Sequence, residues 1–263
     1  MNSPLFEELK STQGFFLIAG PCLAESEQLV MKTADFLTNL AESRKINLIF
    51  KSSYKKANRT SIHSPVGPGL ELGLKYLEKV KTTFALPILT DVHETSEIAA
   101  VSQLVDVIQI PAFLCRQTDL IVKAGKTNRI VNLKKGQFMA PEDMVMAAEK
   151  VTETGNKKVL LTERGTCFGY HDLVVDFRSF AIMAKSGFPV VFDVTHSQQR
   201  PSLSNVSKGT TDYAVMLTRA ALATKQIKGL FLETHPEPEK ALSDATTQIR
   251  LDNLPALLDE LNK

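Results

Sequence analysis

The chain has 263 residues, of which 43% are hydrophobic and 23% charged, the composition of an ordinary globular protein with one large domain or two small ones. A formal net charge of +2 is too small to indicate that the chain binds nucleic acid or a membrane surface. The three cysteines lack CxxC spacing and no apolar signal core stands near the N-terminus, so we expect a cytoplasmic protein without disulfides.

Eight short apolar runs recur along the chain with longer segments between them. Each run is continuously apolar rather than alternating, which is typical of strands that are buried on both faces of a parallel sheet. We therefore predict strands at residues 15–19, 47–50, 87–90, 107–110, 130–133, 159–162, 190–193 and 230–233.

The segments between these runs have the apolar spacing of helices. Residues 140–155 place Pro141 at a plausible first helical position and Gly155 at the end, and residues 211–229 stack small and apolar side chains on one face. Strand and helix alternating eight times predict a (β/α)₈ TIM barrel, an α/β fold, and the alternative is a doubly wound open sheet. We expect a single domain over residues 1–263, with residues 1–14 as a short N-terminal cap.

Polar and charged residues follow nearly every predicted strand, at the end of the barrel where the active sites of this fold lie. Asp91 and Gln109 stand at two of these strand ends. Several cations around one mouth would repel each other unless they bound anions, and phosphate or carboxylate groups suit Arg and Lys. The cations expected there are Lys51, Lys56, Arg59, Arg116, Lys134 and Arg164.

Cys22 follows the first predicted strand directly, behind the Gly-Pro turn of "FLIAGPCLAES". From the residues alone it could fill the core, belong to a redox pair or bind a metal ion. A thiolate, an imidazole and two carboxylates make a plausible divalent-metal set, and closure of a barrel would bring Cys22 near His196, Glu233 and Asp244. The imidazoles that could compete are His93 and His235.

Several longer motifs resemble those of the 3-deoxy-D-manno-octulosonate 8-phosphate synthase (KDO 8-phosphate synthase) family. They follow in order from about residue 16 to residue 244 and cover most of the chain. The motifs are "IAGPCLAES", "KSSYKKANRTSIHSPVGPG", "DVHE", "QIPAFLCRQTDL", "NLKKGQF", "ERGTCFGY", "LVVDFRS" and "DVTHSQQRP". The stretches "HSQQRP" and "TCFGYHD" depart somewhat from the usual form of the family.

The resemblance implies a transferase that condenses phosphoenolpyruvate with D-arabinose 5-phosphate and water. The products would be 3-deoxy-D-manno-octulosonate 8-phosphate and phosphate, in the biosynthesis of the Kdo sugar of lipopolysaccharide. The family is a TIM barrel and usually a homotetramer. A related family, which makes 3-deoxy-D-arabino-heptulosonate 7-phosphate, reads Lys-Pro-Arg-Thr where this chain reads "KANRT", so Ala57 and Asn58 favour the five-carbon sugar phosphate.

The resembled family has two branches that differ at the position of Cys22. One carries Asn there and needs no metal, whereas the other carries Cys and is metal-dependent. The resemblance therefore implies that this chain binds a divalent ion such as Fe²⁺, Zn²⁺, Mn²⁺ or Co²⁺. The implied ligands are Cys22, His196, Glu233 and Asp244.

The resemblance also implies roles for the residues around the mouth. The phosphoenolpyruvate carboxylate and phosphate would be bound by Lys51, Lys56, Lys134 and Arg164. The sugar phosphate would be held by Asn58, Arg59, Thr60 and Ser61, with Gln109 as a further substrate contact and Arg116 reaching the substrate of a neighbouring subunit. The catalytic set would be Lys56, Asp91, His196 and Cys22, with Asp91 near the reacting aldehyde.

Other functions fit parts of this pattern. A Schiff-base phosphosugar aldolase would use Lys51 or Lys134 as a nucleophile with a lowered pKa. An enzyme like the 3-deoxy-D-arabino-heptulosonate 7-phosphate synthases would instead use erythrose 4-phosphate. A phosphosugar-binding barrel without catalysis would keep the cations but would not need metal ligands.

Overall fold

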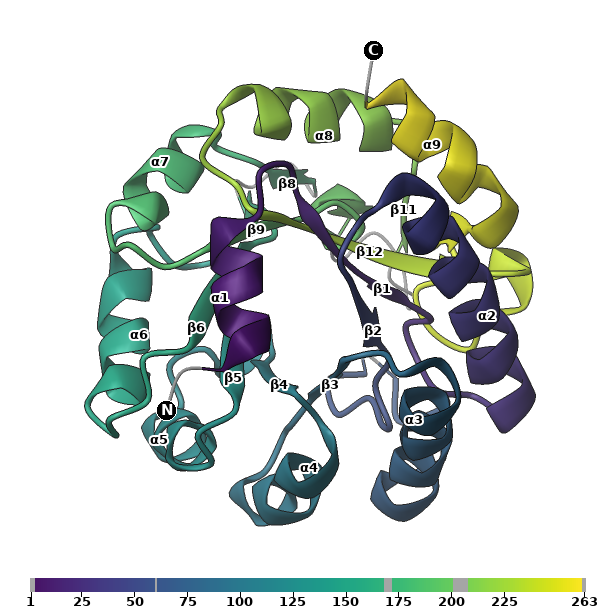
Figure 1. Ribbon diagram of the computed structural model, residues 1–263, viewed down its shortest axis with the longest axis horizontal. Coiled ribbons are helices and arrows are strands. Elements are labelled where there is room, and N and C mark those ends of the chain that lie inside the picture. The colour runs from purple at the N-terminus through teal and green to yellow at the C-terminus, as the bar shows by residue number, and fades with distance from the viewer. Residues whose placement is uncertain (1–2, 60, 168–171, 201–207, 262–263) are drawn as a thin grey trace.

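The computed structural model describes residues 3–59, 61–167, 172–200 and 208–261. All eight predicted apolar runs form parallel strands, and the strand order β1-β2-β3-β4-β5-β6-β9-β12 is closed by pairing of β12 with β1 (Figure 1). This closing pair excludes the open sheet and confirms the (β/α)₈ barrel. The strands are β1 (Phe16–Gly20), β2 (Leu48–Lys51), β3 (Ile88–Asp91), β4 (Val107–Ile110), β5 (Ile130–Lys134), β6 (Val159–Glu163), β9 (Val190–Asp193) and β12 (Gly229–His235).

Helices form a ring around the strands (Figure 1). Their inward faces and the outward faces of the strands make the larger of two apolar clusters. The helices are α2 (Glu27–Arg44), α3 (Leu70–Phe84), α4 (Ile98–Leu104), α5 (Thr118–Lys126), α6 (Asp143–Thr152), α7 (Arg178–Ala184), α8 (Ala214–Ala223) and α9 (Leu254–Glu260). Short 3₁₀ turns are η1 (Thr95–Glu97), η2 (Ala112–Leu114), η3 (His196–Gln198), η4 (Pro238–Lys240) and η5 (Leu251–Asn253).

Helix α6 begins two residues later than the sequence indicates. The amides of Asp143 and Met144 bond to the carbonyls three residues before them, at Ala140 and Pro141, so the segment starts as a tight turn. Pro141 therefore opens this turn, and the helix ends at Thr152, before Gly155 with φ +89°. Gly155 adopts the left-handed backbone that glycine tolerates best.

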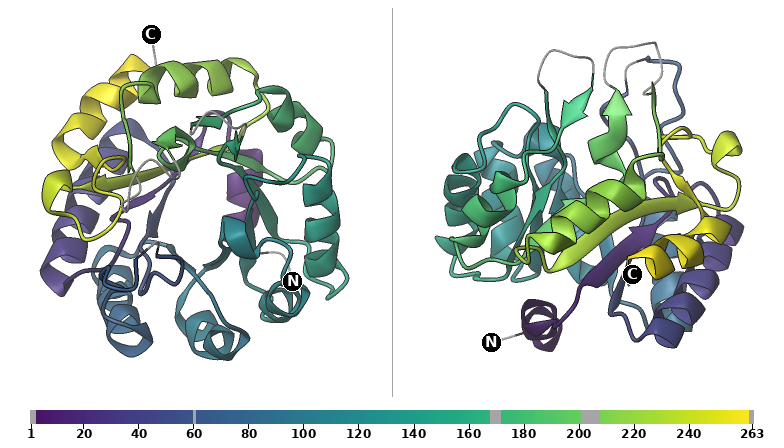
Figure 2. Two further views of the ribbon diagram at one scale, coloured as in Figure 1. Left: turned by 180° about the vertical axis from the view of Figure 1, so that it is seen from behind. Right: turned by 90° about the horizontal axis from the view of Figure 1, so that it is seen from above.

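The second apolar cluster fills the inside of the barrel and is closed at one end by helix α1 (Pro4–Ser11). Phe6 and Leu9 of α1 are buried and join inward-facing strand residues such as Phe16 and Phe231. Figure 2 (right) shows α1 at the end of the barrel opposite the long loops that follow the strands. By burying these two apolar side chains, α1 seals this end of the barrel interior from water.

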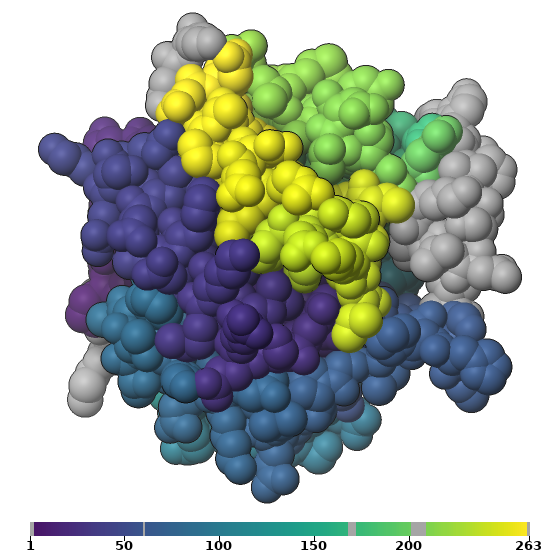
Figure 3. Space-filling view, turned by 90° about the vertical axis from the view of Figure 1, so that its right-hand side faces the viewer, coloured from purple at the N-terminus to yellow at the C-terminus, as the bar shows by residue number. Residues whose placement is uncertain are grey.

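On the outer surface, helix α2 lies beside the last helix of the chain. Figure 3 shows α2 beside α9 and the segment that leads into α9. Arg44 in α2 pairs with Asp259 in α9, with 2.8 Å between Nη2 and Oδ1. Strand β13 (Ile249–Arg250) pairs with the end of β12 and anchors this segment against the barrel. No helix in the described part of the chain has the length and apolar content needed to cross a bilayer.

The C-terminal ends of the strands carry two small antiparallel hairpins. One joins β7 (Thr166–Cys167) to β8 (Leu173–Val174), and the other joins β10 (Gln199–Arg200) to β11 (Lys208–Gly209). Both stand at the end of the barrel opposite α1 (Figure 2, right). At the same end, β1 and β2 approach so closely that a Cβ on Gly20 would lie 2.0 Å from the Lys51 carbonyl oxygen, which explains the glycine before Cys22.

Candidate metal and substrate site

Charged side chains from five strands are buried together at this end of the barrel. Lys51 ends β2, Lys134 ends β5, Arg164 follows β6, Asp193 ends β9 and Glu233 lies in β12, and each is at most 5% exposed. Charged groups are rarely buried to this extent unless they are paired or bind a ligand. The strand register places all of them on one side, so the barrel mouth is a polar, water-poor chamber.

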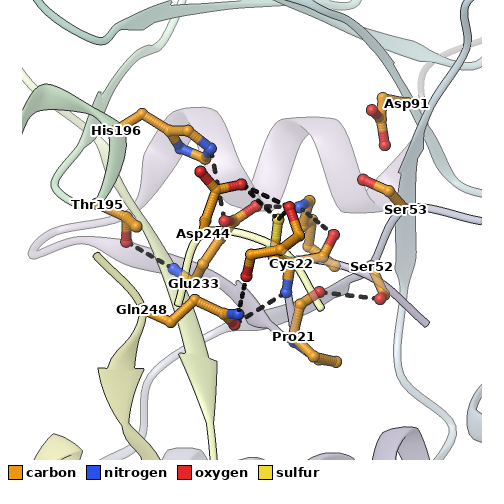
Figure 4. A network of polar contacts seen from close by, with 12 residues as sticks. Pro21, Cys22, Ser52, Ser53, Asp91, Thr195, His196, Glu233, Asp244 and Gln248 are labelled. Carbon is orange, nitrogen blue, oxygen red and sulfur yellow. Dashed lines mark hydrogen bonds and ion pairs between the residues drawn. The ribbon is translucent and has the colours of Figure 1, made fainter. Parts of the chain in front are cut away.

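Cys22, Glu233 and Asp244 form the group that could hold a metal ion. One ligand atom from each lies within 4.8 Å of the others, and Figure 4 shows the three side chains turned toward one another. Cys22 Sγ is 3.0 Å from Asp244 Oδ2 and 3.2 Å from Ser243 Oγ. Residues more than two hundred positions apart are thus brought together by the β1–β12 pairing, as the sequence predicted for these three.

His196, the fourth predicted ligand, borders this group in the structure. Its Nε2 is 3.5 Å from Glu233 Oε2, whereas its Nδ1 faces Asp193 at 2.8 Å from Oδ2. The Asp193 carboxylate thereby orients the ring with Nε2 toward Glu233, which is how carboxylates orient metal-binding histidines. The two competing imidazoles have other partners, since His93 Nε2 lies 3.1 Å from Asp91 and His235 Nδ1 accepts the Glu237 amide.

The electrostatics of the group suit a cation. Burial alone would raise the pKa of Glu233, but Lys51 and His196 outweigh it and lower the pKa to about 2. Asp244 shows the same balance, with its pKa lowered mainly by His196 and Lys56 against burial. Burial raises the pKa of the Cys22 thiol, which favours the protonated form, and a bound metal ion would favour the thiolate instead.

One carboxylate oxygen of this group accepts no hydrogen bond among the described residues, although His196 Nε2 lies 3.5 Å from it. Glu233 Oε2 is buried and accepts no hydrogen bond within the described part of the chain, while Glu233 Oε1 is paired with the Lys51 ammonium. An unsatisfied buried carboxylate oxygen costs free energy that a bound cation would recover. The donor set and this orphaned oxygen therefore fit a divalent metal ion.

Two lysines line the chamber as paired ammonium groups. Lys51 binds Glu233, and Lys134 Nζ lies 2.5 Å from Asp193 Oδ2 and 4.0 Å from the centroid of the Phe231 ring. Burial lowers the pKa of Lys134 although Asp193 acts in the opposite direction. A Schiff-base nucleophile needs a lowered pKa, so the burial of Lys134 agrees with the aldolase alternative on this one point, and borohydride trapping tests it below. Lys56 Nζ, at 3.0 Å from Ser53 Oγ, adds a further cation.

Arg164 is buried with part of its guanidinium unused. Its Nη2 donates to Gln199 Oε1 at 2.5 Å, but its Nη1 is buried and has no partner among the described residues. Burial lowers the pKa of Arg164, although Asp193 and Asp244 oppose this effect. A buried N–H without an acceptor is a point at which a carboxylate or phosphate oxygen can bind.

Asp91 and Gln109 occupy the neighbouring strands β3 and β4. Asp91 Oδ1 is buried without a hydrogen bond among the described residues, whereas Oδ2 faces His93. Burial would raise the pKa of Asp91, but the contact with His93 holds it well below the usual range. Gln109 Oε1 instead accepts a hydrogen bond from Asn132 Nδ2 at 3.0 Å, so this amide is partly engaged inside the barrel.

The loop after β2 carries the residues expected to hold the sugar phosphate. Asn58 is exposed, and Ser61 Oγ accepts the His63 amide at 3.3 Å. Thr60, predicted at the centre of this set, lies outside the described residues. Arg59 crosses to the loop after β12, where its Nη1 lies 2.9 Å from Ser243 Oγ and its Nη2 lies 3.2 Å from the Leu242 carbonyl.

Arg116 is exposed behind η2 and forms no ion pair with any described residue of the chamber. It lines a separate cavity with Met139, Asp143 and Lys150. The other two cysteines also lie outside the metal group: Cys115 is buried against Met139, and Cys167 is exposed on β7.

Sequence reasoning gave no role to Asp193, and it missed three further polar residues of the site. Asp193 stands at a strand end like the others, and that position was its available signal. Gln199, Ser243 and Gln248 touch the predicted ligands through side-chain hydrogen bonds. Gln248 Oε1, for example, accepts the Cys22 amide at 3.1 Å. Such contacts across loops leave no periodic signal in the sequence.

Comparisons with known proteins agree with this arrangement. A model described as the DAHP synthetase I family matches residues 11–263. A protein of Geobacter sulfurreducens named 2-dehydro-3-deoxyphosphooctonate aldolase is 50% identical over 246 residues, which are 93% of this chain and 90% of that protein. Proteins with the same name are similar in Geotalea uraniireducens, at 51% over 93% of this chain and 90% of theirs, and in Syntrophobacter fumaroxidans, at 50% over 97% and 90%.

Proposed function

Because the chain belongs to the DAHP synthetase I family, we propose that it condenses phosphoenolpyruvate with D-arabinose 5-phosphate and water. The products are 3-deoxy-D-manno-octulosonate 8-phosphate and inorganic phosphate, on the route to the Kdo sugar of lipopolysaccharide. The observation that carries this proposal is the sequence identity of about 50%, over 93% of the chain, to proteins named 2-dehydro-3-deoxyphosphooctonate aldolase. The same names, together with "KANRT", disfavour the heptulosonate synthase alternative.

Phosphoenolpyruvate would bind among the buried cations. Its carboxylate and phosphate carry several negative charges, and Lys51, Lys134 and Arg164 present positive charges from three strand ends. The unpartnered Nη1 of Arg164 supplies a directed donor, and Lys56 extends the cationic wall toward the loop after β2. This charge complementarity supports phosphoenolpyruvate as the ligand, because buried cations that repel one another are stabilised by an anion bound between them.

The sugar phosphate would enter from the loop after β2, where Arg59 meets its anion with support from Asn58, Thr60 and Ser61. Its aldehyde would then lie toward Asp91 and Gln109. Asp91 Oδ1 has no hydrogen bond among the described residues, so it can accept one from a substrate hydroxyl or from water.

Cys22, His196, Glu233 and Asp244 would hold a divalent metal ion. When bound, such an ion supplies Lewis acidity that can polarise or orient the aldehyde or activate water. Lys51 remains at Glu233 and keeps that carboxylate ionised. Asp193 keeps His196 Nε2 turned toward the group, and Gln248 holds the Cys22 backbone amide.

In the proposed reaction, C3 of phosphoenolpyruvate forms a bond to the aldehyde carbon and the aldehyde oxygen takes up a proton. Water adds at C2, and the resulting hemiketal phosphate loses inorganic phosphate by cleavage of its C–O bond. The lysines and Arg164 hold the phosphate through these steps, because they stay within the water-poor chamber. Positioning of both substrates accounts for much of the rate of such condensations.

The direct test measures phosphate release from phosphoenolpyruvate with each of two sugar phosphates. We expect turnover with D-arabinose 5-phosphate far above that with D-erythrose 4-phosphate, since "KANRT" lacks the Pro-Arg pair of the heptulosonate synthases. A chelator should remove the activity, and added Fe²⁺, Zn²⁺, Mn²⁺ or Co²⁺ should restore it. Equal or better turnover with the four-carbon sugar would refute the assignment. Borohydride trapping with substrate should give no adduct on Lys51 or Lys134.

We also propose a homotetramer in which Arg116 completes the site of a neighbouring subunit. The exposure of Arg116, away from the partners that hold the other cations, supports this placement. Mixed tetramers of Arg116→Ala and Lys134→Ala subunits should regain activity that neither parent has, because some sites would then contain neither defect. Subunit exchange is verified by mass spectrometry of tagged chains. Lack of recovery after exchange would mean that each site is built from one chain.

A further inference from the structure

Asp244 has a different hydrogen-bond partner on each carboxylate oxygen. Oδ2 faces Cys22 Sγ at 3.0 Å and also accepts from Ser243 Oγ at 2.8 Å. Oδ1 is turned the other way and accepts from Gln199 Nε2 at 2.7 Å. The backbone of Asp244 lies in the left-handed region, with φ +49°, so the side chain leaves an unusual backbone position. The two contacts together decide which oxygen faces the metal group.

Gln199 spans the distance from Asp244 to Arg164. Its amide nitrogen donates to Asp244 Oδ1, while its amide oxygen accepts from Arg164 Nη2 at 2.5 Å. Gln199 is half-buried in β10, and one neutral side chain thus joins a metal ligand to an anion-binding arginine. A glutamine can do this because its amide offers a donor and an acceptor at opposite sides of one plane.

The arginine at the other end has an unused donor. Arg164 Nη1 is buried and has no partner in the described part of the chain, so an anion that binds there would hold the guanidinium plane in place. A fixed guanidinium fixes Gln199 Oε1, and the amide then holds Asp244 with Oδ2 toward Cys22. Conversely, a metal ion bound to Asp244 holds the amide and pre-orients Arg164 for the anion.

We propose that Gln199 is a positioning residue that couples binding of an anionic substrate at Arg164 to binding of a divalent metal ion at Cys22, Glu233 and Asp244. The identification of this anion as phosphoenolpyruvate rests on the proposed function, whereas the coupling itself does not. Because coupling between two binding sites is reciprocal, the anion must raise metal affinity by the same factor by which the metal raises anion affinity.

The coupling is measured without turnover, by titrating metal-free protein with Co²⁺ and following the visible absorption of the Co²⁺–thiolate bond. We expect saturating phosphoenolpyruvate to lower the Kd for Co²⁺ by about tenfold in the parent protein, within the usual range of such couplings. In Gln199→Leu, the Kd for Co²⁺ without phosphoenolpyruvate and the Kd with it should become nearly equal, so that their ratio falls to near one. The Kd for Co²⁺ without phosphoenolpyruvate should also rise about tenfold relative to the parent, as for other residues that orient a metal ligand.

Two further variants sharpen this test. Gln199→Asn keeps the amide but is too short to reach both Asp244 and Arg164, so it should lose the coupling as well. Gln198→Leu is the matched control, because the hydrogen bonds of the Gln198 amide to described residues go to the backbone of Val194 and Tyr213 and not to the metal group or Arg164. It should keep the ratio of the parent. Thermal unfolding checks that every variant is folded before titration.

The proposal would be overturned if phosphoenolpyruvate did not change the Co²⁺ affinity of the parent protein. It would also be overturned if Gln199→Leu had the same ratio of Co²⁺ Kd values, without and with phosphoenolpyruvate, as the parent. Equal loss of coupling in Gln198→Leu would also overturn it, because the effect would then belong to the loop as a whole. Failure of the proposed function is seen separately, as absence of phosphate release with D-arabinose 5-phosphate. In that case inorganic phosphate replaces phosphoenolpyruvate as the probe, and the same ratios decide the coupling.

Discussion

Replacing Cys22 by asparagine should lower the affinity for divalent metal by more than the roughly hundredfold that loss of a ligand-orienting contact can cost. A thiolate is the softest of the four proposed ligands, and a neutral amide oxygen is a poor substitute on a borderline-soft ion. Asp244 Oδ2, now 3.0 Å from Sγ, would face an amide that cannot carry negative charge. Metal content after dialysis and Co²⁺ titration measure this loss.

Activity of Cys22→Asn should survive in part. The resemblance that places Cys22 in a metal-dependent branch also implies a second branch with Asn at that position and no metal. The residual activity should therefore resist a chelator, whereas the parent loses activity with a chelator and regains it with Fe²⁺, Zn²⁺, Mn²⁺ or Co²⁺. Lys51, Lys134 and Arg164 still bind the anionic substrate in this variant because none of them is held by the Cys22 side chain.

Cys167→Asn is the matched control, since Cys167 is exposed on β7 and lies outside the metal group. It should keep the metal content and chelator response of the parent. Two results would each contradict one of these predictions. If the parent protein kept its activity after exhaustive chelation, Cys22 would be a structural residue. If Cys22→Asn were folded but wholly inactive, the metal would be indispensable to the chemistry.

Arg59→Ala should raise the KM for D-arabinose 5-phosphate about thirtyfold, because a lost charge-assisted contact to phosphate costs about 2 kcal/mol. Arg59 is suited to this role since the acceptors that it contacts, Ser243 Oγ and the carbonyls of Pro65 and Leu242, are neutral. No carboxylate in the described part of the chain pairs with it, so its charge remains available for an anion.

The KM for phosphoenolpyruvate should change much less in Arg59→Ala, because Lys134 and Arg164 lie on other strand ends. Arg44→Ala, which removes an arginine from the outer contact with Asp259, controls for loss of charge as such. Steady-state kinetics with each substrate varied in turn separate the two constants. A KM for the sugar phosphate that stays at the parent value would place Arg59 outside its binding site.

The sequence by itself determined the order of strands and helices and the side of the barrel on which chemistry is possible. Continuous apolar runs identify buried strands because the pattern is local, and each polar residue behind a run is placed by the strand that precedes it. The motifs around Cys22 and His196 also indicated the family, and three of the four predicted metal ligands do lie within 4.8 Å of one another. These inferences needed only local pattern and barrel closure.

Tertiary structure decided the contacts between loops. Gln199 meets Asp244, and Arg59 meets Ser243, across separations of 45 and 184 residues. Neither pair has a periodic spacing, because each depends on how two loops fold over the barrel and on the rotamer of each side chain. The turn at Pro141, because of which α6 begins two residues later than predicted, likewise depends on backbone hydrogen bonds that more than one conformation could form. The barrel brings strand ends together, and the loops then select which polar atoms touch.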